Sequence, residues 1–193
     1  MKYIVLGFAL VFNLFYLPAH ADGSSNNINL MLGQKQLESD DWESPYDEQG
    51  EFGILCDFRG ENWPVSLALE FLGSAKDDTE DGLTVTGSTT EICIGLKKIW
   101  ETDNTRVRPF VGFGLASITA KIEGEYEGIT ASTEETGVGF YISGGVLFTL
   151  TEHFNLGFIA RFSKANVTFE NQYVESDIEA GGSHAGILVG FHW

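Results

Sequence analysis

Cysteine, long apolar runs and basic side chains are all scarce in this chain. Two cysteines among 193 residues are too few for a disulfide framework. We expect Cys56 and Cys93 to be packing residues, because the strands predicted for them are not neighbours. After residue 21, no apolar stretch reaches the roughly 20 residues of a spanning helix. If this part of the chain crosses a membrane, it must do so with strands.

Basic residues are few: 11 Lys and Arg stand against 28 Asp and Glu, which gives a formal net charge of −17. A protein that binds nucleic acid needs a basic patch on its surface. The charge balance therefore argues against a nucleic-acid partner.

The first 21 residues have the features of a signal peptide. Lys2 provides a positive start, the segment 3–17 is almost wholly apolar, Pro18 ends it, and Ala19-His20-Ala21 is an A-x-A cleavage pattern. We expect cleavage before Asp22, which leaves residues 22–193 as one domain. The chain is then exported and carries its signal only in the precursor.

Apolar residues recur at every second position in eight segments, which predicts eight strands. The last one is typical: Trp193, Phe191, Val189 and Ile187 alternate with polar or small residues. The other segments follow the same pattern, although the seventh loses phase after Phe162, which suggests a β-bulge there. The eight predicted strands are 28–37, 50–58, 64–73, 89–100, 106–120, 137–150, 154–168 and 184–193.

The connections between these segments alternate between short and long. The short ones are 59–63, 101–105 and 151–153, and the long ones are 38–49, 74–88, 121–136 and 170–183. An even number of strands with short turns at one end and long loops at the other is the architecture of an outer-membrane barrel. The long loops hold 19 of the acidic residues and two of the basic ones, so the excess negative charge lies on one rim.

The non-apolar face of the predicted strands carries four acids and four bases. A soluble barrel would not bury eight charges, because each unpaired ion costs several kcal/mol. The interior of a membrane barrel is polar, and eight strands enclose a space that side chains fill. We therefore predict an all-β fold, an eight-stranded antiparallel up-and-down transmembrane β-barrel, with an interior plugged by a charge network of Lys35, Glu51, Asp57, Glu70, Glu91, Lys97, Arg108 and Arg161.

Three stretches resemble the small OmpA/OmpX-like barrel family. Residues 108–116 (RPFVGFGLA) are similar to the family's "RPYVGxGxG" strand, and residues 144–156 (GGVLFTLTEHFNL) to its "GG-x-x-Y-x-L-T" hairpin. Residues 189–193 (VGFHW) look like its closing strand, although Phe is the commoner last residue. The resemblance implies a cell outer-membrane location and recognition of the closing strand by the assembly machinery. The residues that would carry this recognition are Ala185, Ile187, Val189, Phe191 and Trp193.

The expected function is structural or interactive, with no cofactor, no metal site and no catalytic residue. Outer-membrane lipid and lipopolysaccharide are the expected surroundings, and the acidic loops could meet divalent cations or host surface molecules. Hard cations take oxygen ligands, but runs such as Asp40-Asp41, Asp77-Asp78 and 123–127 lack EF-hand spacing.

Three alternatives remain open at this point. The first is passage or binding of a small apolar molecule, which the charged lumen disfavours. The second is a lipid A-modifying enzyme, for which Ser183 and His184, with Glu179, Glu70 or Glu91, are the nearest approach to a catalytic set. Neighbours on a strand point to opposite faces, so Ser183 and His184 should not meet. The third is a soluble secreted barrel with the apolar face inside.

Overall fold

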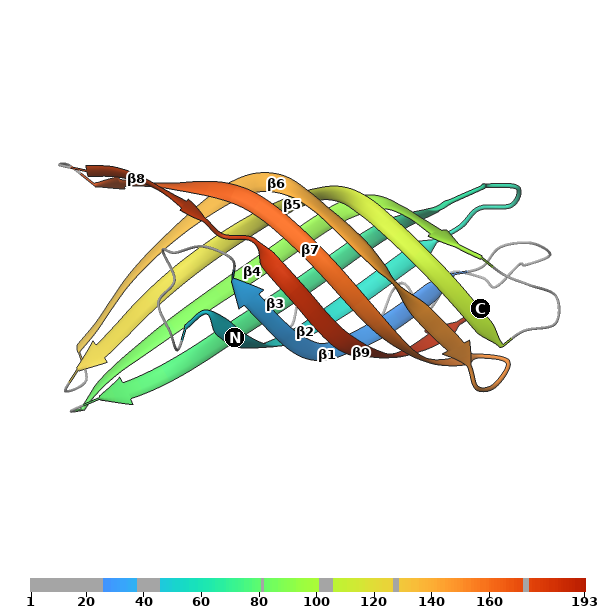
Figure 1. Cartoon of the computed structure of the whole chain (residues 1–193), viewed down its shortest axis with the longest axis horizontal. Coiled ribbons are helices and arrows are strands. Elements are labelled where there is room, and N and C mark those ends of the chain that lie inside the picture. The colour runs from blue at the N-terminus through green and yellow to red at the C-terminus, as the bar shows by residue number, and fades with distance from the viewer. Residues whose placement is uncertain (1–25, 38–45, 81, 101–105, 127–128, 172–173) are drawn as a thin grey trace.

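The computed structural model describes residues 26–37, 46–80, 82–100, 106–126, 129–171 and 174–193. They form nine strands (Figure 1). The predicted signal peptide lies outside this range. No helix among the described residues is both long and apolar enough to cross a membrane. The strands are β1 (Asn27–Leu37), β2 (Glu48–Phe58), β3 (Ser66–Glu80), β4 (Leu83–Ile99), β5 (Val107–Tyr126), β6 (Ile129–Thr149), β7 (Phe154–Asn171), β8 (Val174–Glu179) and β9 (Gly182–His192).

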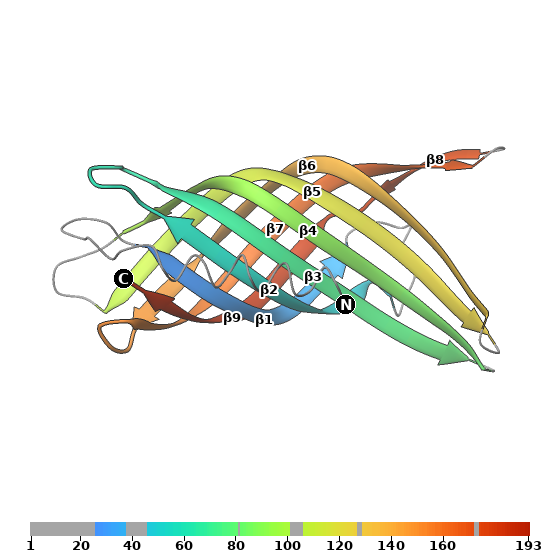
Figure 2. The same ribbon diagram turned by 180° about the vertical axis from the view of Figure 1, so that it is seen from behind.

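Eight of these strands close into an antiparallel barrel, as predicted. Each of β1 to β6 pairs with the next strand along the chain, and β9 lies between β7 and β1 and closes the barrel. Figures 1 and 2 show the tilted wall from opposite sides.

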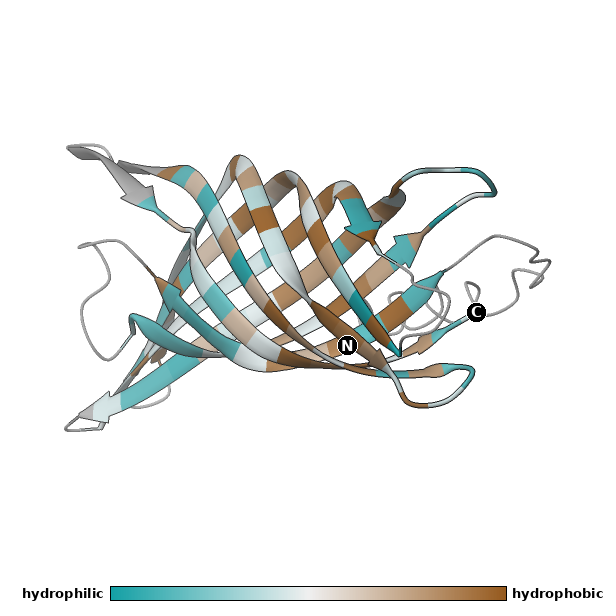
Figure 3. Ribbon diagram, turned by 45° about the vertical axis from the view of Figure 1, so that its right-hand side comes forward, coloured by the Kyte–Doolittle hydropathy of each residue, from teal (hydrophilic) through white to brown (hydrophobic). Residues whose placement is uncertain are grey.

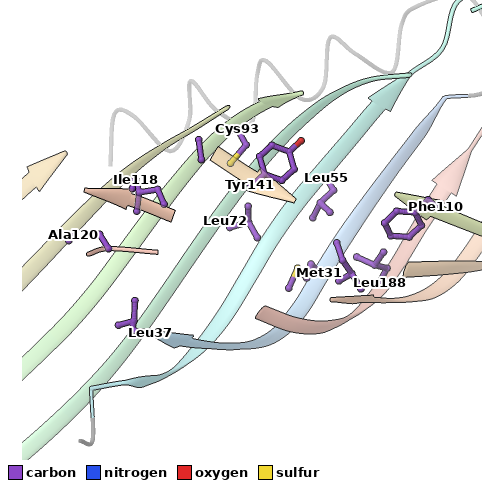
Figure 4. Close-up of a cluster of buried hydrophobic side chains, with 14 of the residues drawn as sticks. Met31, Leu37, Leu55, Leu72, Cys93, Phe110, Ile118, Ala120, Tyr141 and Leu188 are labelled. Carbon is purple, nitrogen blue, oxygen red and sulfur yellow. The ribbon is translucent and has the colours of Figure 1, made fainter. Parts of the chain in front are cut away.

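The alternation of side chains sends apolar residues outward and polar residues inward. Leu32 is 65% exposed and Phe113 is 61% exposed, whereas the inward neighbour Met31 is fully buried. Apolar residues form a belt round the middle of the wall, with hydrophilic residues toward both ends (Figure 3). Inward apolar side chains such as Leu55 and Leu188 pack together in the lumen (Figure 4). A wall that is apolar outside and charged inside suits lipid and not water.

Two of the predicted long loops are mostly strand. β3 and β4 pair as far as Glu80↔Leu83, and β5 and β6 pair as far as Tyr126↔Ile129. The prediction of loops at 74–88 and 121–136 is therefore wrong. These segments are rich in Thr, Ser and Glu, so they lack the apolar alternation that marks a strand buried on one face.

The predicted loop 170–183 also contains strand. β8 pairs with the end of β7, from Asn166↔Glu179 to Asn171↔Val174. The predicted bulge near Ser163 is absent, because the inward alternation of Arg161, Ser163, Ala165 and Val167 continues without a break. The phase is hard to read in the sequence because inward Ala165 and Val167 are apolar, whereas outward Lys164 and Asn166 are polar.

The described short turns, 59–63 and 151–153, and both described ends lie at the other end of the barrel (Figure 1). The backbone N–H of Asn26 donates to the carbonyl of Trp193 at 2.9 Å, and that of Trp193 donates back at 3.2 Å. Trp63, Trp100 and Phe154 are exposed on this side, as expected of rings at a membrane boundary. Cys56 and Cys93 are unbridged, as predicted, and both are buried.

Candidate functional site

The charge network lies in the lumen, where inward positions of six strands bring it together. Each member occupies an inward position in the alternation, and each is at most 7% exposed. β1, β2 and β3 supply Lys35, Glu51, Asp57 and Glu70, while β4, β5 and β7 supply Glu91, Lys97, Arg108 and Arg161.

Glu91 is the centre of a hairpin-side cluster, which we define as Lys35, Glu51, Glu91, Arg161, Ser163 and His184. Lys35 Nζ donates to Glu91 Oε1 at 2.8 Å, and an Arg161 guanidinium nitrogen donates to Glu91 Oε2 at 2.6 Å. The same lysine also donates to Thr89 Oγ1 at 2.8 Å. These are charge-assisted hydrogen bonds of short length, and both oxygens of the carboxylate are used.

His184 is a member that the sequence placed on the inward face but did not assign to the network. Its Nδ1 lies 2.7 Å from Glu51 Oε1, and its Nε2 lies 3.0 Å from Ser163 Oγ. Ser163 Oγ also donates to Glu91 Oε1 at 2.9 Å. The register explains the meeting, since His184 faces Lys35 across β1–β9 and Arg161 across β7–β9.

A turn-side cluster, which we define as Asp57, Glu70 and Lys97, is held more loosely. Lys97 Nζ lies 3.6 Å from Asp57 Oδ2 and 3.5 Å from Glu70 Oε1. Glu70 Oε2 lies 3.4 Å from Arg161 Nε, which links the two clusters. These separations are those of ion pairs and exceed ordinary hydrogen-bond lengths.

Aromatic rings and amides complete the turn side of the network. The Arg161 guanidinium lies 4.5 Å from the centre of the Tyr141 ring, and Lys97 Nζ lies 5.4 Å from that of Phe110. Arg108 donates to the side-chain oxygens of Asn155 at 2.8 Å and Asn27 at 3.1 Å. Asn27 in turn donates to Asp57 Oδ1 at 2.7 Å, so Arg108 reaches this carboxylate through an amide. The sequence prediction missed these two asparagines.

The contact of Ser163, His184 and Glu51 has the connectivity of a nucleophile, a base and an orienting acid. This set uses Ser163 and not Ser183, the serine that the sequence analysis considered as a nucleophile beside His184. Ser163 is fully buried and shares its hydroxyl with Glu91, so a substrate would meet a closed wall. Glu179, the acid weighed with Ser183, instead pairs with Lys164 at 2.7 Å.

The closing strand β9 exposes the residues singled out for assembly. Ala185, Ile187, Val189 and Phe191 face outward, and Trp193 is half-buried. Among the described residues, no group of three His, Cys, Asp or Glu side chains could hold a metal ion. Of the acidic runs weighed for cations, Asp40, Asp41 and residue 127 lie outside the described residues.

The model of the outer membrane protein beta-barrel domain matches residues 7–191. The chain belongs to this family. A member of this family resides in the outer membrane, so the apolar belt faces lipid and the projecting hairpins lie on the side away from the short turns. No curated protein matches the sequence significantly.

Solved structures show the same fold at low sequence identity. Ail of Yersinia pestis, solved with the heparin analogue sucrose octasulfate, is 14% identical and has a TM-score of 0.61, with 89% of this chain and 99% of that chain covered. Neisserial surface protein A is 13% identical, with a TM-score of 0.58 and coverage of 89% and 96%. OprG from Pseudomonas aeruginosa is 10% identical, with a TM-score of 0.52 and the same coverage of both chains.

Proposed function

We propose that the protein is a closed outer-membrane anchor that presents an acidic surface to cationic partners outside the cell. The plugged interior supports the first part. Charged side chains fill the lumen at several levels, and none is more than 7% exposed. A continuous aqueous path would need these paired ions to separate, at a cost of several kcal/mol. In planar bilayers the protein should therefore show no stepwise conductance.

The part of the protein that meets partners is a projecting sheet, defined as residues 76–80 of β3, 83–87 of β4, 121–126 of β5 and 129–136 of β6. Registers pair these four segments side by side, from Lys76↔Gly87 through Gly87↔Ile122 to Ile122↔Thr133. The strands continue out of the barrel wall at the end away from the short turns (Figure 2).

The projecting sheet is acidic. Its described side chains include six acids and two bases: Asp77, Asp78, Glu123, Glu125, Glu134 and Glu135, with Lys76 and Lys121. One of the bases is already occupied, since Lys121 donates to Glu123. This hydrogen bond and the charge of Glu123 raise the pKa of Lys121. A surface with this balance favours a basic partner.

The backbone of β6 offers a second means of recognition, and this observation carries the proposal. Among the described residues, the β6–β7 register begins at Gly139↔Ala165, and Gly137 still lies against Asn166 of β7, so the outer edge of 129–136 pairs with no strand there. An open edge presents backbone donors and acceptors that an extended peptide can complete. We therefore propose an extended, basic segment as the partner.

The test measures binding of a synthetic peptide with alternating Thr and Lys to the protein in nanodiscs. We expect binding at low salt that weakens as salt screens the charges. Changing Glu123, Glu125, Glu134 and Glu135 to Gln should abolish it. The matched control is Glu61→Gln with Glu152→Gln, two exposed acids on the short turns, which should bind as the parent does. Equal loss in the control would contradict the proposal.

A peptide with alternate amides N-methylated tests the role of the edge. This peptide keeps every charge, but its backbone has no N–H groups along one edge to donate to β6. Its binding should therefore be weaker. Heparin, which carries sulfate groups, should not bind the acidic sheet. Retention of heparin, or equal binding of both peptides, would reject the proposed partner.

The proposal includes no catalytic step. The burial of Ser163 and His184 supports this, because neither side chain can reach a lipid from the lumen. Incubation with lipid A followed by mass spectrometry should leave the acyl pattern unaltered. For assembly, we propose that β9 is the segment read by the assembly machinery, so that Phe191→Ser should lower the amount of barrel in the outer membrane.

A further inference from the structure

The outer face of the barrel wall contains a hollow of about 590 Å³ across β1 to β4. Its floor is formed by Gly50 of β2 and Gly73 of β3, both exposed. Neither glycine has any atom within 4 Å of the position that a Cβ would occupy on it. The wall is thus recessed here because the outward side chains are missing from two paired strands.

The hollow lies at the border of the apolar belt that is nearer the projecting sheet. Leu32 and Phe52 bound it on the belt side, where they are 65% and 47% exposed. Ser88 and Thr90 of β4 line it with hydroxyl groups. The lining of the hollow therefore changes from apolar to polar over a short distance, which matches a molecule with an apolar and a polar end.

Two carboxylates stand beyond the hollow on the same outward face. Glu48 is two residues past Gly50, and Asp77 is four residues past Gly73, so they lie roughly 7–13 Å further along their strands. Both are exposed. The neighbouring base, Lys76, alternates to the opposite face of the sheet from Asp77. Glu51, beneath the floor, is engaged by His184.

We propose that this hollow seats one acyl chain of a phospholipid whose headgroup carries an ammonium group. The outward face of a wall at the hydrocarbon belt meets lipid. An acyl chain in the recess gains contacts on several sides that it lacks on a smooth wall. Glu48 and Asp77 attract an ammonium group at headgroup level and repel the phosphates of lipopolysaccharide. The inference does not depend on the partner proposed for the projecting sheet.

The test counts lipid molecules retained by the protein in native mass spectrometry after extraction from vesicles. The vesicles contain phosphatidylethanolamine and phosphatidylglycerol with the same acyl chains, and a second set contains lipid A. The parent should retain phosphatidylethanolamine over phosphatidylglycerol by about twofold to fivefold, the range that exposed charge pairs give. Preferential retention of lipid A or of phosphatidylglycerol would overturn the proposal.

A variant in which a side chain fills the hollow distinguishes lipid bound in the hollow from lipid that contacts the wall elsewhere. Gly73→Leu adds a side chain into open space, so the fold should tolerate it, and the retained lipid should fall. Gly144→Leu is the matched control, because Gly144 shares the outward face of β6 with Ile142 and a Cβ there would meet only ordinary contacts at 3.7 and 4.0 Å. Equal retention by the Gly73→Leu variant and the parent would overturn the acyl-chain seat.

The headgroup part has its own variant. Glu48→Gln with Asp77→Asn should keep the retained lipid but remove the preference for phosphatidylethanolamine. Persistence of the preference in this variant would overturn the role of the two carboxylates. The migration of unboiled protein on a denaturing gel shows that each variant is folded.

Discussion

The two ends of the lumen hold similar charges in different ways. On the hairpin side, Glu91 receives hydrogen bonds at 2.6 and 2.8 Å from two cations and a third from Ser163. On the turn side, Lys97 meets its two carboxylates at 3.5 and 3.6 Å. The difference shows that the presence of opposite charges does not by itself set the strength of an interior network. What matters is whether each buried oxygen and nitrogen has a donor or acceptor in reach.

The neighbours of the two clusters explain the difference. The hairpin-side cluster draws on His184 and Ser163, a planar and a small group that can approach a carboxylate closely, and on Thr89, which accepts from Lys35. The turn-side cluster is packed among larger apolar groups, including Phe110, whose ring lies under Lys97. We therefore expect the hairpin side to tolerate the loss of a charge less well than the turn side.

The largest effect should come from Arg161→Ala. This change removes the shortest bond to Glu91 and the ion pair with Glu70, and it leaves two buried carboxylates short of a cation. We expect the free energy of unfolding to fall by about 3–5 kcal/mol. Urea unfolding in lipid vesicles, followed by tryptophan fluorescence, measures it. A loss below about 1 kcal/mol would show that water replaces the guanidinium in this part of the lumen.

A smaller loss is expected from Lys97→Met, which keeps the length of the side chain and removes its charge. Asp57 keeps its bond from Asn27, and Glu70 keeps Arg161, so neither carboxylate is left alone. We expect the free energy of unfolding to fall by about 1–3 kcal/mol, because the one oxygen of each carboxylate that faces Lys97 loses its partner. The same urea series applies. If this variant loses more than Arg161→Ala, the comparison of the two ends is wrong.

The sequence predicted the barrel well because the membrane imposes one simple requirement on every spanning strand. Each spanning strand must be apolar on one side, so Leu32, Phe113 and Ile187 mark their faces without help from tertiary structure. Above the membrane that requirement ends. Residues 121–126 and 129–136 pair as strands through backbone hydrogen bonds, and their polar composition gives no apolar alternation in the sequence.

The interior could be predicted by residue type but not by contact. Parity alone places Glu51, Glu91 and Lys35 inside, whereas the meeting of His184 with Ser163 depends on the stagger of β9 between β7 and β1. Counting back from the short turn at 151–153 gives the β6–β7 register, such as Ser143↔Arg161, but not the Arg161↔His184 pair of β7 and β9. The asparagines that link Arg108 to Asp57 gave no signal, because Asn27 lies at the very start of β1.

The smallest expected effect comes from His184→Gln, which tests how finely the hairpin-side cluster is fitted. A glutamine amide can donate to Glu51 but cannot also span the distance to Ser163, so one of the two bonds of His184 is lost. We expect the free energy of unfolding, measured in the same urea series, to fall by about 0.5–1.5 kcal/mol, the usual net value of one hydrogen bond. The matched control is Ser163→Ala in both backgrounds. If His184 and Ser163 act through their mutual bond, the two losses should not add. Full additivity would mean that Ser163 acts only through Glu91, and the hairpin side would then owe its tighter fit to the two cations alone.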